Sequence, residues 1–124
     1  MNYNDTLKSL KPFIDKFQSD YERLLSLIRG KSLCFTIYYP AFKYYKDFGQ
    51  MLQYQTSCEI TINIFNDIIQ RLVKKKGFEL LELREIFTAK NDYSNSIEPS
   101  HTGGNKIASA ISNWVNRNYN KDLK

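Results

Sequence analysis

The feature that most constrains the fold is a helical stripe that lies between two short apolar segments. Apolar side chains recur every three or four residues from Ile60 to Val73, and the stripe stops at a lysine triplet followed by Gly77. This spacing predicts an amphipathic helix that a glycine terminates in the left-handed conformation. Leu33 to Tyr39 precedes the stripe and Phe78 to Leu83 follows it, and both are typical of strands covered on two faces. A strand, a helix and a second strand form a βαβ unit, which implies parallel strands joined by a right-handed crossover.

Further helices are predicted on both sides of this unit. Phe13 to Ile28 has helical spacing, and Pro12 fits the first turn of that helix. Because proline breaks a helix interior, Thr6 to Lys11 is expected to form a separate turn or short helix. Ala41 to Thr56 has no steady period and is predicted to be an ordered loop with a short helix.

The last stripe follows Gly103 and Gly104 and consists of Ile107, Ala108, Ile111, Trp114 and Val115. It predicts a final helix, after which residues 116–124 form a polar tail. The whole order is helix, strand, loop, helix, strand, loop, helix, and 124 residues suffice for one domain. The sequence therefore predicts one α/β domain over residues 1–124.

Composition narrows the function classes. The net charge of +5 permits an anionic partner, but outside the polar tail the basic residues are scattered apart from Lys74 to Lys76, where cations offset the negative end of a helix dipole. A nucleic-acid binder is therefore not favoured. Cys34 and Cys58 are too few for a disulfide framework and lie near no metal-ligand partner, so no metal or cofactor is expected. No signal peptide or membrane span is recognisable, which predicts a cytoplasmic protein.

Candidate chemistry lies in the loops beyond the carboxyl ends of the predicted strands, where open α/β sheets bind ligands. One such loop follows Tyr39, and the other runs from Thr88 to Gly104. The second holds Asp92, Ser100 and His101, which suggest a catalytic triad, but triads are recognised by geometry rather than spacing. The alternative interpretation is that Ser100 or Thr102 caps the final helix while the two glycines allow a tight entry.

A family resemblance rests on this second loop. Ile97 to Ser100, followed by Gly103 to Ala108, resembles the last conserved block of SGNH (GDSL-type) hydrolases, in which Asp-X-X-His-Pro-Ser precedes a glycine and the final helix. Leu33 to Pro40 then looks like the fourth strand of that fold, Ile60 to Gly77 like the next helix, and Phe78 to Phe87 like the fifth strand.

The resemblance has departures that bear on activity. Asn4 and Asp5 look like the end of the family's Gly-X-Asn-Asp block, whose asparagine donates to the oxyanion hole, but Asn2 stands in place of its glycine. The Asp-X-X-His pair falls on Asn95 and Glu98, so the orienting acid and the general base are both replaced. The Gly-Asp-Ser block that carries the nucleophile has no counterpart.

The resemblance implies a partial flavodoxin-like, three-layer α/β/α fold with about two parallel strands and flanking helices. Asn4 would be the oxyanion donor, and Glu98, or His101 three residues later, would be the base. Without the nucleophile block we expect no ester hydrolysis by the chain alone. The alternative is a non-catalytic binding or interaction module. The missing central strand would leave the edge of Leu33 to Tyr39 open, so a complementing N-terminal half or self-association is the expected partner.

Overall fold

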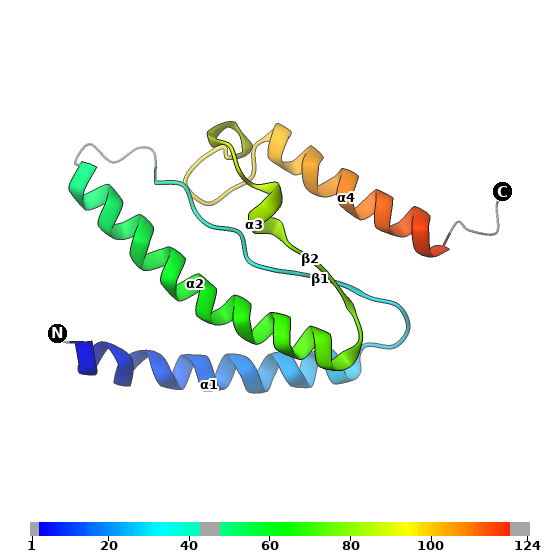
Figure 1. The fold of residues 1–124 in the computed structure, drawn as a ribbon, viewed down its shortest axis with the longest axis horizontal. Helices are drawn as coiled ribbons and strands as arrows, with labels where there is room; N and C mark the ends of the chain where they lie inside the picture. Colours follow the sequence, from blue (N-terminus) through cyan, green and yellow to red (C-terminus); the bar gives the residue numbers. More distant parts are fainter. Residues whose placement is uncertain (1–2, 43–47, 120–124) are drawn as a thin grey trace.

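The computed structural model describes residues 3–42 and 48–119, and it is mostly helical with a small parallel sheet between the helices (Figure 1). The elements in chain order are helix α1 (Tyr3–Leu27), strand β1 (Leu33–Phe35), helix α2 (Phe48–Lys76), strand β2 (Glu79–Leu81), helix α3 (Leu83–Ile86), the 3-10 turn η1 (Lys90–Asp92) and helix α4 (His101–Tyr119). The predicted order of helices and strands, and the mixed α/β character, are confirmed.

The two strands form a parallel pair, as the βαβ pattern predicts. Leu33 lies opposite Glu79 and Phe35 lies opposite Leu81. Each strand has three residues, fewer than predicted. The ladder extends to the amide of Thr36, which donates to the carbonyl oxygen of Leu81 (3.1 Å), and then stops. It stops there because the next amide on the β2 side, that of Leu83, donates to the hydroxyl of Thr36 (2.8 Å) instead of to a backbone carbonyl of β1.

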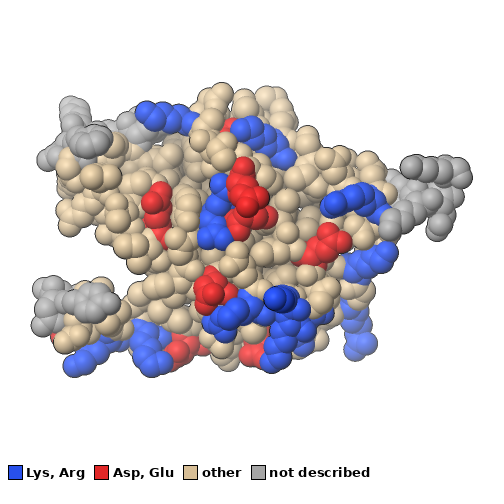
Figure 2. Space-filling model, in the orientation of Figure 1, with Lys and Arg blue, Asp and Glu red and all other residues tan. Residues whose placement is uncertain are grey.

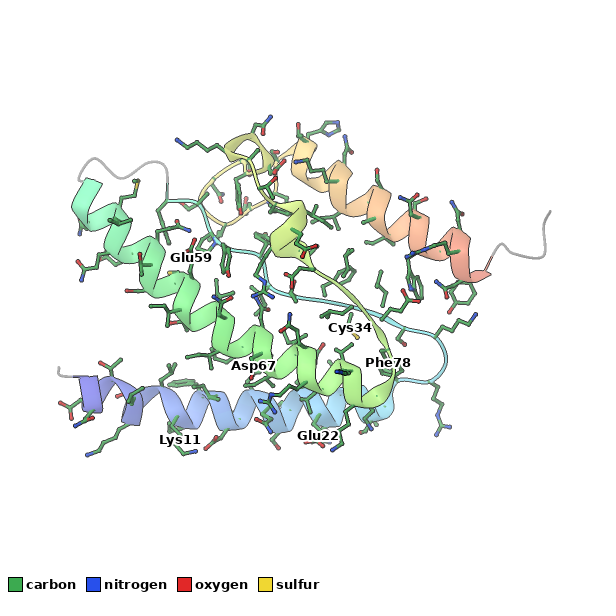
Figure 3. All side chains as sticks on the ribbon, in the orientation of Figure 1. Lys11, Glu22, Cys34, Glu59, Asp67 and Phe78 are labelled. Carbon is green, nitrogen blue, oxygen red and sulfur yellow. The ribbon has the colours of Figure 1, made fainter. Side chains whose placement is uncertain are left out.

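The helices lie on both sides of the sheet. In Figure 1, α2 runs along one side, α1 packs against the outer side of α2, and α4 lies on the opposite side of the sheet. The core between α1, α2 and the sheet contains Leu25, Cys34, Ile68, Ile69, Leu72 and Val73. Figure 3 shows Cys34 and Phe78 beside the last turns of α2. The predicted apolar stripe therefore faces both α1 and the sheet, although its first residue, Ile60, is exposed.

The cover over β1 is incomplete. Cys34 and Thr36 are buried, whereas Phe35 and Ile37 keep 38% and 40% of their surface exposed. Successive strand side chains point to opposite faces, so one face of β1 packs against α2 and the other is partly open. The prediction that this segment is covered on both faces is wrong. The reason is that α4 lies along β2, where Arg117 Nη2 is 3.9 Å from Glu79 Oε2.

Helix α1 is longer than predicted, because it runs unbroken from Tyr3 through Pro12 to Leu27. The expectation of a separate turn over Thr6 to Lys11 is wrong. A proline leaves the carbonyl four residues earlier without its helical donor, here that of Lys8. Lys8 and Pro12 are both exposed, so water can satisfy this carbonyl and the helix continues.

Helix α2 also begins earlier than predicted, at Phe48, so the helical part of Ala41 to Thr56 belongs to α2 and is not a separate short helix, while residues 43–47 of the predicted loop lie outside the described residues. Tertiary contacts stabilise this irregular part of the helix. Gln55 Nε2 donates to the carbonyl of Pro40 (2.7 Å), and Gln55 Oε1 accepts from the amide of Phe42 (3.2 Å). The segment after β1 is thereby attached to the first turns of α2.

Helix α4 likewise extends past the predicted start of the polar tail. It continues to Tyr119, whose hydroxyl donates to the carbonyl of Lys31 (3.2 Å) and whose ring packs edge-on against Trp114. Asn116 to Tyr119 is therefore helical, and the rest of the predicted tail, residues 120–124, lies outside the described residues.

One buried polar side chain joins β1 to α2. Asn66 has no exposed surface, its Oδ1 accepts from the amide of Ile37 (2.7 Å), and its Nδ2 donates to the carbonyl of Ile37 (2.8 Å). This is the pair of bonds that a neighbouring strand would make. Asn66 thus ends the outer edge of β1 at Ile37.

We expect Asn66→Ala to lower the free energy of unfolding by about 2–4 kcal/mol, because it leaves an amide and a carbonyl of Ile37 without partners in the interior. Urea unfolding followed by circular dichroism measures this change. Gln53→Ala, at an exposed position of the same helix, is the control and should change stability by less than about 0.5 kcal/mol. Equal effects of the two substitutions would contradict this role for Asn66.

Candidate functional site

A polar cluster lies at the carboxyl ends of the two strands. Thr36 Oγ1 donates to Glu82 Oε1 (2.6 Å) and accepts from the amide of Leu83 (2.8 Å). Gln70 Nε2, from α2, lies 3.3 Å from the second carboxylate oxygen of Glu82. Glu82 also caps α3 by accepting from the amide of Arg84. One carboxylate therefore connects β1, β2, α2 and α3.

Arg84 completes this cluster on its outer side. Its Nε and Nη2 reach the two carboxylate oxygens of Glu82 at 2.6 and 2.5 Å, which is the paired geometry that a guanidinium forms with a carboxylate. Its Nη1 donates to Asn63 Oδ1 (2.6 Å), which also accepts from the hydroxyl of Tyr39 (2.7 Å). The guanidinium lies 5.9 Å from the centre of the Tyr39 ring.

The cluster keeps Glu82 ionised. The hydrogen bonds from Arg84 lower the pKa of Glu82 to about 2, against the opposing effect of burial and with a further contribution from Thr36. The pKa of Arg84 is raised, first by its hydrogen bond to Glu82. A carboxylate held in this way is a poor general base, because its proton affinity is far below that required near neutral pH.

A second ion pair fixes the start of α4. Asp92 is fully buried, and its carboxylate accepts from the amides of Thr88 (3.1 Å) and Ala89 (3.0 Å). Lys106 Nζ lies 2.8 and 3.0 Å from its two oxygens. The hydrogen bond from Lys106 and those from the backbone lower the pKa of Asp92 although burial opposes this. Asp92 is a structural anion that holds the loop against α4.

Ser100 caps α4, which confirms one of the two interpretations open from the sequence. Its Oγ accepts from the amide of Gly103 (3.1 Å) and donates to the carbonyl of Asn91 (2.5 Å). Gly103 permits the close approach, because a Cβ there would lie 2.1 Å from the backbone oxygen of Asp92. Asp92, Ser100 and His101 therefore do not act as a triad in this structure, since both Asp92 and Ser100 are engaged with the backbone and Lys106.

The structure does not bring the predicted catalytic residues together. Asn4 is exposed in the first turn of α1, and Figure 1 shows α1 and α4 on opposite sides of α2. Glu98 is exposed in the loop before α4, where its amide donates to Asn95 Oδ1 (2.8 Å). His101 is the exposed first residue of α4. Glu98 and His101 share one loop end, and Asn4 lies away from it.

A cavity of about 580 Å³ opens beside the carboxyl ends of the strands. Its walls are mostly apolar and come from the segment after β1, from the first turns of α2 and from the segment around η1. The lining includes Tyr39, Phe42, Leu52, Glu59, Phe87 and Tyr93. The sequence pattern predicts functional loops at this end of the sheet. It does not indicate the carboxylates of Glu59 and Glu82, or Asn63 and Arg84, as polar groups of this end.

Comparisons with protein-family models, with curated proteins and with solved structures found no match. Among the residues that the structure describes, no group of three or more acidic, histidine or cysteine side chains is arranged to hold a metal ion. No helix within these described ranges is long and apolar enough to cross a bilayer. On the face shown in Figure 2, basic and acidic side chains are interspersed.

Gly103→Ala should destabilise the protein by about 2 kcal/mol or more, because the added Cβ would collide with the backbone oxygen of Asp92. The neighbouring Gly104→Ala provides a matched control, since a Cβ there meets nothing within 4 Å. It should stabilise α4 by up to about 1 kcal/mol through helix propensity. Thermal and urea unfolding of both variants test this difference. Destabilisation by both substitutions, or stabilisation by both, would contradict it.

The low pKa of Glu82 predicts that the folded protein loses stability as the pH falls. Its folded pKa of about 2 lies below the ordinary value of 4.5, so its contribution to stability is present above about pH 5 and is lost as the pH falls toward 2. Glu82→Gln should lower stability at pH 7 and flatten the decline between pH 5 and 3. Asp92 contributes with the same sign, so some decline should remain. Glu85→Gln, at an exposed site on α3, should leave the pH profile unchanged.

Proposed function

We propose that the chain is a partial α/β unit similar to the C-terminal half of SGNH hydrolases, that it has no esterase activity alone, and that it acts by accepting a further strand at the outer edge of β1. The partner is a complementing N-terminal half or, in the purified chain, a second copy. The observation that carries this proposal is the open edge of β1.

The hydrogen-bond pattern of the sheet supports an open edge. The carbonyl of Ser32 and the amide of Thr36 both bond to β2, at 3.2 and 3.1 Å. Backbone groups of successive residues in a strand point to opposite sides, so the even-numbered residues face β2 and Leu33, Phe35 and Ile37 face away from it. The bonds from Asn66 to Ile37 agree with this parity.

The side chains of the same segment are apolar and partly exposed. Phe35 and Ile37 lie on the face opposite α2, where α4 covers β2 but leaves β1 partly open, and the edge carries no charge or proline before Pro40. Native proteins usually protect an open edge with charges, proline or a covering element. An apolar, unprotected edge is instead typical of a site for strand addition.

Two observations support the proposal that the chain by itself has no esterase activity. Asn4 lies away from Glu98 and His101, and the Ser100 hydroxyl is bonded to the backbone. The hydroxyl of Ser100, the serine adjacent to His101, donates to the backbone carbonyl of Asn91. Acyl transfer by a serine requires a base that accepts this hydroxyl proton. Ser100 therefore lacks the arrangement that activates a nucleophile.

Two assays on the purified chain test the proposal. We expect light scattering to show self-association and p-nitrophenyl acetate to be hydrolysed no faster than in buffer, with no change in Asn4→Ala or Glu98→Ala. A soluble monomer with ester turnover that both substitutions abolish would show that the chain is a complete small enzyme.

A pair of substitutions at Phe35 tests the edge itself. Phe35→Pro removes an amide that faces away from β2, so the ladder with β2 is preserved while strand addition is blocked. Phe35→Ala removes the same side chain and keeps the amide. We expect Phe35→Pro to be monomeric and Phe35→Ala to retain association with reduced affinity, with both folded by circular dichroism. Association of Phe35→Pro equal to that of Phe35→Ala would exclude backbone pairing at this edge.

A further inference from the structure

The cavity at the carboxyl ends of the strands has aromatic walls. Tyr39 and Phe42 come from the segment after β1, and Phe87 and Tyr93 come from the segments on either side of η1. Met51 and Leu52 of α2 contribute aliphatic surface. The volume of about 580 Å³ lies within the range of sites that hold small organic molecules.

These walls are held in place without a ligand. The Tyr93 hydroxyl donates to the carbonyl of Tyr39 (2.5 Å), and the ring of Phe87 packs edge-on against Tyr93 with centroids 5.2 Å apart. Behind them, Tyr38 stacks on Phe87 at 4.3 Å. Gln55 attaches the other wall to α2 through Pro40 and Phe42. A preformed cavity loses little conformational entropy when a ligand binds.

One carboxylate lies in this lining. Glu59 is half-buried, and Figure 3 shows it on the side of α2 that faces the segment after β1. Its Oε1 accepts from Gln55 Nε2 (3.0 Å), and its Oε2 has no hydrogen-bond partner among the described residues. Lys90 also lines the cavity and is exposed.

The charge of Glu59 is felt within the cavity wall. Burial raises the pKa of Tyr93 first of all, and repulsion from Tyr38 when it is ionised, from Asp92 and, least, from Glu59 raises it further. Aromatic faces carry negative potential as well, so they attract cations. A half-buried carboxylate beside aromatic rings therefore disfavours anions and favours a positively charged group that reaches Oε2.

We infer that this cavity is a binding site for a small organic cation, namely an amine attached to a flat apolar group, with Glu59 as the partner of the ammonium group and Tyr39, Phe42, Phe87 and Tyr93 around the apolar part. The inference is independent of the proposed strand addition, because the cavity is formed by side chains beyond the carboxyl ends of the strands and does not use the outer edge at Leu33 and Phe35.

Three probes of similar size and different charge test this site: 2-phenylethylamine, 2-phenylethanol and 3-phenylpropanoate. Titration of the full chain, followed by amide chemical shifts, should show the amine binding about tenfold more tightly than the alcohol, with no binding of the carboxylate. The shifts should be largest at Ala41, Phe42, Thr88 and Ala89, whose amides lie around the cavity. Equal affinity for the amine and the alcohol would overturn the inference.

Two variants separate the contribution of the Glu59 charge from that of the cavity volume. Glu59→Gln should reduce the affinity for the amine about tenfold to that for the alcohol, while Glu22→Gln, an exposed acid on α1, should leave it unchanged. Leu52→Trp should reduce the binding of both probes by filling the cavity, and it keeps the test valid if Glu59→Gln does not fold. Unchanged amine affinity in a folded Glu59→Gln, or in Leu52→Trp, would place the amine elsewhere.

Discussion

The structure depends on hydrogen bonds that side chains add to a very short sheet. A parallel pair of three-residue strands has few ladder bonds, and parallel pairs are normally buried in larger sheets. Thr36 extends the pairing beyond the ladder, because its hydroxyl bonds to both Glu82 and the amide of Leu83. Asn66 attaches β1 to α2 through both backbone groups of Ile37. The strands are thus fixed by polar groups at one end and by the core around Cys34 at the other.

The polar cluster and the cavity both lie at the carboxyl ends of the two strands. Glu82 holds Arg84, which holds Asn63 and the ring of Tyr39, so the segment after β1 leaves the sheet in one direction. Asp92 holds the loop before α4 against that helix through its ion pair with Lys106. Both carboxylates are engaged as structural anions, Glu82 with Arg84 and Asp92 with Lys106. Glu59 differs, because it retains an oxygen directed to no described donor, and this is the reason that the candidate ligand contact lies there.

Periodicity in the sequence was enough to predict α2, its buried face and the parallel pairing, because each follows from where apolar side chains recur. It was not enough for α1 at Pro12, where exposure to water removed the usual cost of proline, or for the start of α2, which Gln55 stabilises through the distant segment after β1.

In the loop before α4, the spacing of Ser100 and Gly103 predicted a helix cap correctly. Neither Glu82 nor Glu59 was predicted. Their partners Arg84 and Gln55 are close in sequence, but the contact of Glu82 with Thr36 and the place of Glu59 in the cavity lining arise only when distant segments meet. The resemblance named Asn4, Glu98 and His101, and the chain does not bring Asn4 to the other two.

The arrangement of Asn66 sets how a partner strand could bind. By closing the edge at Ile37, Asn66 leaves only Leu33 and Phe35 with backbone groups directed outward, so an added strand would gain few hydrogen bonds. Each such bond contributes about 1 kcal/mol net, which is small beside the entropy lost when two chains associate. Most of the affinity would therefore have to come from burying the exposed surface of Phe35 and Ile37, on the face that α4 leaves open. A strand that brought apolar side chains, or its own helix, over this face would satisfy both requirements, whereas a bare polar peptide would satisfy neither.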